Sequence, residues 1–158
     1  YKVHKAVEYY AAYFTVRSEN LDGAIAMQGH QAVRDKMNNI KQKQSVHEAT
    51  AKDEAEFQTL QIVNEMMARE IEFLPVDIYK SEAKMFKVED GKIRLPFSSL
   101  PGVGGAAADS LAETGKHTEY LSIEDMQIKT KVTKAVIETL KDVGVLKDLP
   151  ESSQMSLF

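Results

Sequence analysis

The feature that most constrains the fold of this 158-residue chain is a short internal repeat near its carboxyl end. Residues 97–115 align without a gap on residues 126–144, and apolar or glycine positions coincide along the alignment. The matched pairs are Phe97 with Met126, Val103 with Val132, Ala108 with Ile137, Leu111 with Leu140, and Gly115 with Gly144. Internal repetition is typical of one supersecondary unit that is used more than once. We therefore expect two similar units, packed together, in this part of the chain.

The first copy contains a glycine-rich turn at residues 100–105, followed by a helix that continues to Gly115. Gly102 and Gly104 allow positive φ angles and a close approach of the backbone to a partner. The first amides of a helix lack acceptors within the helix, so they favour an anion such as a phosphate. The pattern predicts a helix-hairpin-helix unit that contacts a DNA backbone without reading its bases.

In the second copy, residues 129–133 take the place of the glycine-rich turn, and they contain no glycine but, together with Lys134, three lysines. Ser122, followed by Glu124 and Asp125, predicts the start of a helix that leads into this turn. The lysines would meet phosphates by charge, whereas residues 105–109 of the first copy are uncharged and then acidic, so the first turn would bind through its backbone alone. The expected DNA-binding residues are Leu100, Pro101, Gly102, Val103, Gly104, Gly105, Lys129, Thr130, Lys131, Val132, Thr133 and Lys134.

Residues 102–107 also satisfy the loose Gly-x-Gly-x-x-Ala fingerprint of dinucleotide-binding proteins. That fingerprint requires a returning parallel strand that ends in an acidic residue about 20 positions later. Residues 121–129 occupy that place and have the pattern of a capped helix, which disfavours a dinucleotide site. A glycine turn without a ligand, and an ordinary solvated helix end at the lysines, are further interpretations that the sequence leaves open.

Apolar spacing predicts helices upstream of the repeat. One helix spans residues 5–16, a second spans 31–43, and a third begins with Asp53 as its cap, has Glu56 in capping-box position and ends near Glu70. The first helix would pack through Val7, Tyr10, Ala11 and Phe14, and the second through Val33, Met37 and Ile40. Residues 20–23 have the composition of a turn.

The Asp90-Gly91 pair lies between two partly alternating runs, residues 84–88 and 92–97, and predicts a β-hairpin. An isolated hairpin is marginally stable, so it must pack on helices or pair with further strands. The expected fold class is mainly α with a small β-hairpin. The expected organisation is a helical segment at 1–74, a connecting β-hairpin segment at 75–97, a tandem helix-hairpin-helix domain at 98–149 and a flexible tail at 150–158.

The tail ends in two large apolar residues. On a mobile terminus such side chains bury no surface within their own fold, so another reason for them is needed. This pattern favours a short linear motif that inserts into a pocket of a partner protein, and a hydrophobic end without a binding role is the other interpretation. The motif consists of Gln154, Met155, Ser156, Leu157 and Phe158.

The formal net charge of −4 means that any DNA contact must be local, because a strongly basic balance is absent. The chain has no cysteine, which excludes a disulfide framework and a thiolate metal site, and its four histidines lack the spacing of metal ligands. No catalytic carboxylate pair and no membrane-spanning apolar run is recognisable, so we expect neither catalysis nor a bound cofactor within these residues.

Several segments, in order along the chain, resemble the carboxyl-terminal region of the PolC-type bacterial DNA polymerase III alpha subunit. The resemblance is carried by residues 8–17, 73–81, 95–104, 121–125 and 149–158. The tail is similar to the family's sliding-clamp-binding pentapeptide, Gln-Leu-Ser/Asp-Leu-Phe, with Met155 in place of the usual leucine. Residues 1–74 would then form the end of the polymerase fingers.

The resemblance implies a fragment of a replicative DNA-directed DNA polymerase, a nucleotidyltransferase with a proofreading exonuclease, in the bacterial cytoplasm near the nucleoid. The family uses Mg²⁺ held by palm aspartates, which lie outside these residues. The implied partners are primer-template duplex, the sliding clamp and other replisome subunits, but no membrane. An adaptor that stands alone and binds the clamp but not DNA is the alternative.

Overall fold

The computed structural model describes residues 2–17 and 20–151. Within these residues the chain is mainly helical with one small sheet, which confirms the expected fold class. The elements are α1 (Lys2–Val16), α2 (Gly23–Gln28), α3 (His30–Ser45), α4 (Ala51–Ala68), β1 (Phe73–Leu74), β2 (Lys87–Glu89), β3 (Lys92–Arg94), the 3₁₀ helix η2 (Phe97–Ser99), α5 (Gly105–His117), α6 (Ile123–Thr130) and α7 (Lys134–Asp142). Among the described helices, none has the length and apolar character that crossing a bilayer requires.

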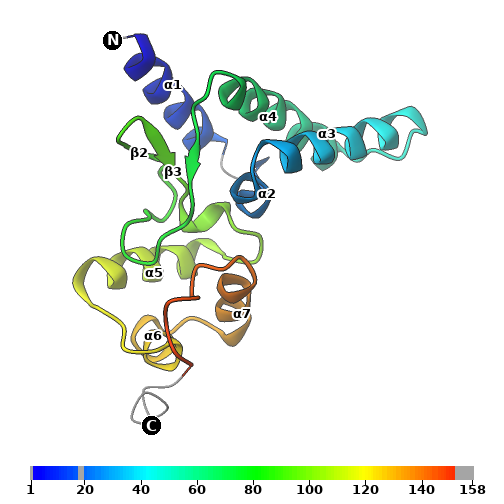
Figure 1. Cartoon of the computed structure of the whole chain (residues 1–158). Helices are drawn as coiled ribbons and strands as arrows, with labels where there is room; N and C mark the ends of the chain where they lie inside the picture. Colours follow the sequence, from blue (N-terminus) through cyan, green and yellow to red (C-terminus); the bar gives the residue numbers. More distant parts are fainter. Residues whose placement is uncertain (1, 18–19, 152–158) are drawn as a thin grey trace.

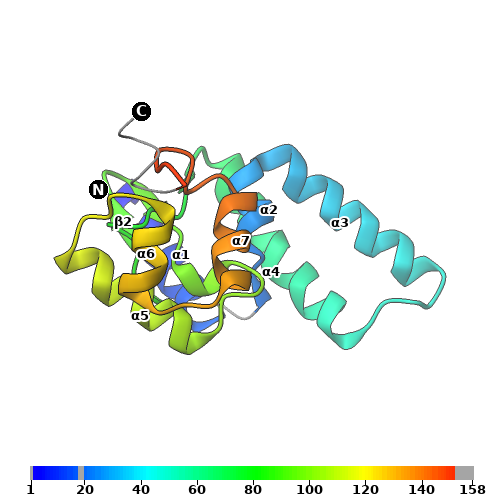
Figure 2. The same cartoon turned by 90° about the horizontal axis from the view of Figure 1, so that it is seen from below.

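Three groups of elements share one continuous hydrophobic core. Helix α1 and the small sheet lie together, and α3 and α4 form a pair that projects sideways (Figure 1). Helices α5, α6 and α7 form the third group, at the carboxyl-terminal end of the molecule. Seen from below, α5, α6 and α7 lie side by side while the α3–α4 pair extends away from them (Figure 2).

Helix α1 packs through the face that its apolar spacing predicts. Its residues Val7, Tyr10, Ala11 and Phe14 are buried. The ring of Phe14 lies 5.3 Å from that of Phe73 and 5.7 Å from that of Phe86, measured between centroids. These contacts fix α1 on the sheet.

The predicted β-hairpin forms between β2 and β3, with Asp90 (φ 50°) and Gly91 (φ 78°) in its turn. Its length is shorter than the sequence indicated, and it gains a third strand that periodicity did not predict. Strand β1 pairs in parallel with β3, with Phe73 opposite Ile93 and Leu74 opposite Arg94. A strand of two residues is too short to show alternation, so only the pairing identifies it.

Two helix starts differ from expectation because other side chains provide the caps. Asp53 is the third residue of α4 and not its cap: the Thr50 hydroxyl accepts a 3.0 Å hydrogen bond from the Asp53 amide, and the Asp53 carboxylate accepts from the Thr50 amide. This backbone hydrogen bond lowers the pKa of Asp53. The expected turn at residues 20–23 instead begins α2, because the Asp22 carboxylate accepts from the amides of Ala24 and Ile25.

Helix α5 approaches the connecting segment closely at Gly115. A Cβ atom added there would lie 2.2 Å from the carbonyl oxygen of Ile78, which is backbone and has little room to move. We expect Gly115→Ala to lower the free energy of unfolding by about 1–3 kcal/mol, as overpacking of a core does. The measurement is urea denaturation of the purified chain.

Gly105→Ala in the same helix is the matched control, because a Cβ there meets nothing closer than 3.9 Å. Its free energy of unfolding should stay within about 1 kcal/mol of the unmodified chain. Equal destabilisation by both substitutions would contradict the close approach at Ile78.

Candidate nucleic-acid interface

The internal repeat of the sequence is a repeat of backbone geometry. Gly102 (φ 89°) and Lys131 (φ 60°) both have a positive φ angle. The next residue in each copy is a buried valine, Val103 or Val132. The third residue, Gly104 (φ −73°, ψ 170°) or Thr133 (φ −73°, ψ 161°), is the N-cap of α5 or α7. We call residues 100–104 the first hairpin and residues 129–133 the second hairpin.

The two hairpins are held against one another by specific contacts. The hydroxyl of Ser110 on α5 donates a hydrogen bond to the carbonyl of Thr130 at the end of α6. A Cβ atom on Gly102 would lie 3.3 Å from the hydroxyl oxygen of Thr139 on α7. Each hairpin therefore touches an element of the other copy, so their helix starts keep a fixed relation.

The predicted DNA-binding residues divide into two groups by exposure. The side chains of Leu100, Val103, Thr130 and Val132 are buried, so they hold the hairpins in place and leave only their backbone for a ligand. The exposed members are Pro101, Gly102, Gly104, Gly105, Lys129, Lys131, Thr133 and Lys134.

The two helix starts offer different donors. At α5 no side chain caps the helix, and its first internal hydrogen bond is donated by the Ala108 amide to the Gly104 carbonyl. At α7 the Thr133 hydroxyl accepts from the Val136 amide at 3.3 Å. The α5 start thus presents more free amides, whereas the α7 start is partly capped by its own chain.

Lys84, which the sequence did not single out, stands beside the first hairpin. A Cβ atom on Gly105 would lie 3.9 Å from the Nζ atom of Lys84, and the lysine side chain is exposed. Lys84 belongs to the segment before β2, so only the folded structure brings it to α5. It supplies the positive charge that residues 105–109 lack.

The three lysines of the second hairpin are not equivalent. The ammonium of Lys129 lies 2.9 Å from the carboxylate of Asp125, and it also donates to the Glu119 carbonyl. Hydrogen bonds from the Leu121 amide and from Lys129 lower the pKa of Asp125. Within residues 2–17 and 20–151, Lys131, Lys134 and Lys84 have no carboxylate at ion-pair distance.

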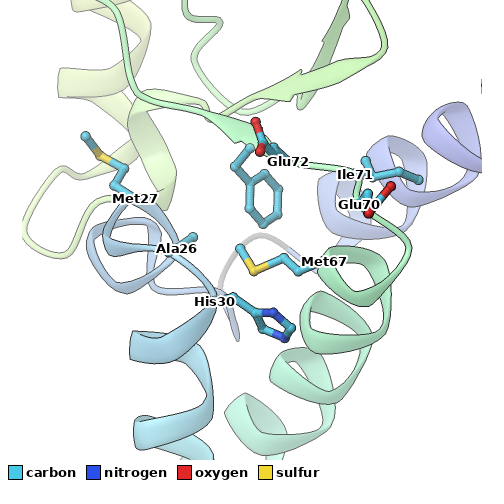
Figure 3. Close-up of a pocket in the computed structure, with 9 residues that line it drawn as sticks. Ala26, Met27, His30, Met67, Glu70, Ile71 and Glu72 are labelled. Carbon is cyan, nitrogen blue, oxygen red and sulfur yellow. The ribbon is translucent and has the colours of Figure 1, made fainter.

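A cleft of about 440 Å³ lies away from the hairpins, where α2 and α3 meet the end of α4 and β1. His30 and Met67 face each other across it, and Glu70 and Glu72 stand on its rim (Figure 3). The His30 Nε2 atom lies 2.5 Å from the Asn64 Oδ1 atom and links α3 to α4. Two carboxylates on the rim repel phosphate, so the candidate interface does not include this cleft.

The dinucleotide interpretation is wrong, because residues 123–130 form α6 where a parallel strand would be needed. In the described part of the chain, no group of three or more histidine, aspartate or glutamate side chains could hold a metal ion.

The segment that leads into the tail is fixed to the start of α6. The Pro150 carbonyl accepts from the Ile123 amide at 2.8 Å, and the Glu151 carbonyl accepts from the Glu124 amide at 3.2 Å. The Glu151 carboxylate also lies 3.1 Å from the Lys141 ammonium. The predicted clamp-binding residues Gln154, Met155, Ser156, Leu157 and Phe158 lie outside the described residues.

Comparison with known proteins gives two results. A family model described as a helix-hairpin-helix motif matches residues 70–155, which is more than half of the chain. Proteins named DNA polymerase III PolC-type match the whole chain: 37% identity over 158 residues in Thermotoga maritima, and 40% over 158 residues in both Clostridium perfringens and Halalkalibacterium halodurans. The chain spans 11% of the length of each of these relatives.

The equivalence of the two hairpins predicts opposite effects of two substitutions. Lys131→Gly should raise the free energy of unfolding by up to about 1–2 kcal/mol, because glycine accepts a left-handed conformation without the cost of a side chain. Gly102→Ala should lower it by a similar amount. Thermal and urea unfolding measure both, and a loss of stability in Lys131→Gly would contradict the shared geometry.

Proposed function

We propose, from the premise that this chain belongs to the helix-hairpin-helix family, that it binds the sugar-phosphate backbone of duplex DNA through its two hairpins. The observation that carries the proposal is the same backbone geometry found twice, each time with an exposed helix start. Beside the first start stands Lys84 and beside the second stand Lys131 and Lys134, none of which has a carboxylate at ion-pair distance among the described residues. Such contacts position a protein on a duplex and do not read its sequence.

The two hairpins would bind phosphate by different means. The first provides uncapped amides at the start of α5, and the Lys84 ammonium adds a charge next to them. The second provides Lys131 and Lys134, which flank the start of α7. Because the chain carries a net charge of −4, these local cations, and not the overall charge, would determine the affinity.

We further propose that the chain is the carboxyl-terminal part of a bacterial replicative DNA polymerase. The support is identity of 37% to 40% along the whole chain to relatives named DNA polymerase III PolC-type. Nucleotide transfer, its Mg²⁺ ions and the exonuclease would then belong to other parts of that polymerase. The role of this chain would be to hold the primer-template duplex, in the cytoplasm and at the nucleoid.

Gln154–Phe158 would bind a sliding clamp and tether the polymerase and other replisome subunits to it. Leu157 and Phe158 could each contribute roughly 1.5–3 kcal/mol when buried, but ordering a free peptide offsets much of this. A modest affinity would suffice when both proteins hold the same DNA, because the effective concentration is high.

The contacts at α6 support simultaneous use of tail and hairpins. Pro150, which leads into the tail, is bound to Ile123 at the start of α6, whereas Lys131 lies directly after the end of α6. A helix of 8 residues places these points about 12 Å apart along its axis. An adaptor that binds the clamp alone is the other candidate, and the absence of duplex binding at about 50 mM salt would favour it.

Replacing Lys131 and Lys134 with alanine should reduce the salt dependence of duplex binding, because each lost phosphate contact lowers the slope of log K against log salt by about 0.9. The expected change is about 2 for the double variant and about 1 for Lys84→Ala. Fluorescence anisotropy with a labelled duplex at several salt concentrations measures the slope.

Lys129→Ala is the matched control, because this lysine lies in the same hairpin but is paired with Asp125. Its slope should stay close to that of the unmodified chain. An unchanged slope in the double variant would count against phosphate contact at the second hairpin.

Deleting Leu157 and Phe158 should abolish binding to a purified bacterial sliding clamp and leave duplex affinity unchanged, because the two contacts are proposed to be separate. Surface plasmon resonance on immobilised clamp, together with duplex anisotropy, tests this. Parallel loss of both activities would contradict independent sites.

A further inference from the structure

The α3–α4 pair forms an arm that stands out from the rest of the molecule (Figures 1 and 2). Its helices bury a narrow apolar seam and leave their other faces in solvent. The buried residues of the seam are Val33, Met37 and Ile40 on α3 and Leu60, Val63 and Met66 on α4. The remaining faces of the two helices carry exposed side chains, so the chemistry of those side chains is informative.

One side of α3 carries a line of hydrogen-bond donors. Arg34, Asn38 and Lys41 are exposed and follow one another at helical spacing, four and then three residues apart. Residues at this spacing lie on the same side of a helix. We call these three residues the donor stripe.

The cations of the donor stripe differ from the other cations of α3. Lys36 and Lys43 face α4, where they lie 3.8 Å from the carboxylates of Glu56 and Asp53. Within residues 2–17 and 20–151, no carboxylate lies at ion-pair distance from Arg34 or Lys41. The Lys41 ammonium lies over the ring of Phe57 on α4, 5.9 Å from the ring centroid, and this contact leaves its charge without a counterion.

The arm is also polarised in charge. Helix α3 has Asp35 as its single carboxylate, and that group accepts a 2.9 Å hydrogen bond from the Gln31 side-chain amide. Helix α4 has Lys52 as its single lysine and carries its other charges as carboxylates. Helix α3 is thus the basic helix of the arm, in a chain that is acidic as a whole.

The middle of α3 also contains residues that a purely structural helix would not favour. Asn38 and Asn39 are consecutive and exposed, and neither side chain has a hydrogen-bond partner among the described residues. Asparagine lowers helix stability relative to alanine, lysine or glutamate by several tenths of a kcal/mol. Residues that weaken a helix and make no stabilising contact within the fold are expected where the surface of that helix serves binding.

We infer that the donor stripe is a second contact for the DNA phosphate backbone, separate from the two hairpins. The inference rests on the proposed function, since it assumes that the chain holds DNA. Guanidinium and ammonium groups only donate hydrogen bonds and phosphate oxygens accept them, and the Asn38 amide adds a neutral donor between the two charges. Arg34 and Lys41 lie about 10 Å apart along the helix axis, which corresponds to about three base-pair steps.

The test compares two charge-matched double variants by duplex anisotropy over a series of salt concentrations, with a 30-base-pair duplex as the probe. Arg34→Ala with Lys41→Ala should lower the salt slope by about 2, since each phosphate contact contributes about 0.9. Lys52→Ala with Arg69→Ala removes the same charge from α4 and its C-cap residue, and should leave the slope unchanged. Circular dichroism checks that both variants keep their helix content.

A slope for the Arg34 and Lys41 variant equal to that of the control would overturn the inference. If the slope falls in the Lys131 and Lys134 variant but not here, the hairpin proposal survives alone. If neither variant changes the slope, both proposals fail. Poly-glutamate serves as the competing ligand: tighter binding to it than to duplex at equal salt, lost in the Arg34 and Lys41 variant, would assign the stripe to an acidic protein instead.

Discussion

A valine buried directly after a left-handed residue is the contact on which the rest of this domain depends. It occurs at Val103 and again at Val132, and in each case it fixes the residue that begins the next helix. The buried side chain lies inward while its neighbours on both sides remain exposed. The same apolar contact therefore stabilises the core and orients two helix starts toward solvent.

The repeat allowed the two hairpins and the helices after them to be predicted from sequence, because buried positions recur with the same spacing. Contacts between distant segments could not be predicted in this way. Strand β1 is defined by its pairing with β3, and Lys84 reaches α5 only in the folded chain. Lys129 is paired with Asp125, although the sequence did not distinguish it from the other lysines of the second hairpin. Helix caps were partly predictable: Ser122 caps α6 as expected, but Thr50 and not Asp53 caps α4.

The distribution of charge explains how an acidic chain can be suited to a polyanion. Many cations of this chain are used within the fold, as Lys36, Lys43, Lys116 and Lys129 are. In the described part of the chain, the cations without a carboxylate at ion-pair distance include Lys84, Lys131 and Lys134 at the hairpins, Arg34 and Lys41 on α3, and exposed lysines elsewhere such as Lys80, Lys87 and Lys147. Neutralised cations contribute little to the field outside the molecule, so places where several free cations stand close together attract a phosphate most strongly.

The anchoring of Pro150 and Glu151 also has a mechanical meaning. Any force applied through the last residues passes to α6 through the amides of Ile123 and Glu124, and to α7 through Lys141 and the chain itself. Two hydrogen bonds and the Glu151–Lys141 pair share that load before it reaches the hairpins. Tension on the tail would therefore be borne first at the start of α6 and near the end of α7, which are the ends of these helices farther along the chain from the second hairpin.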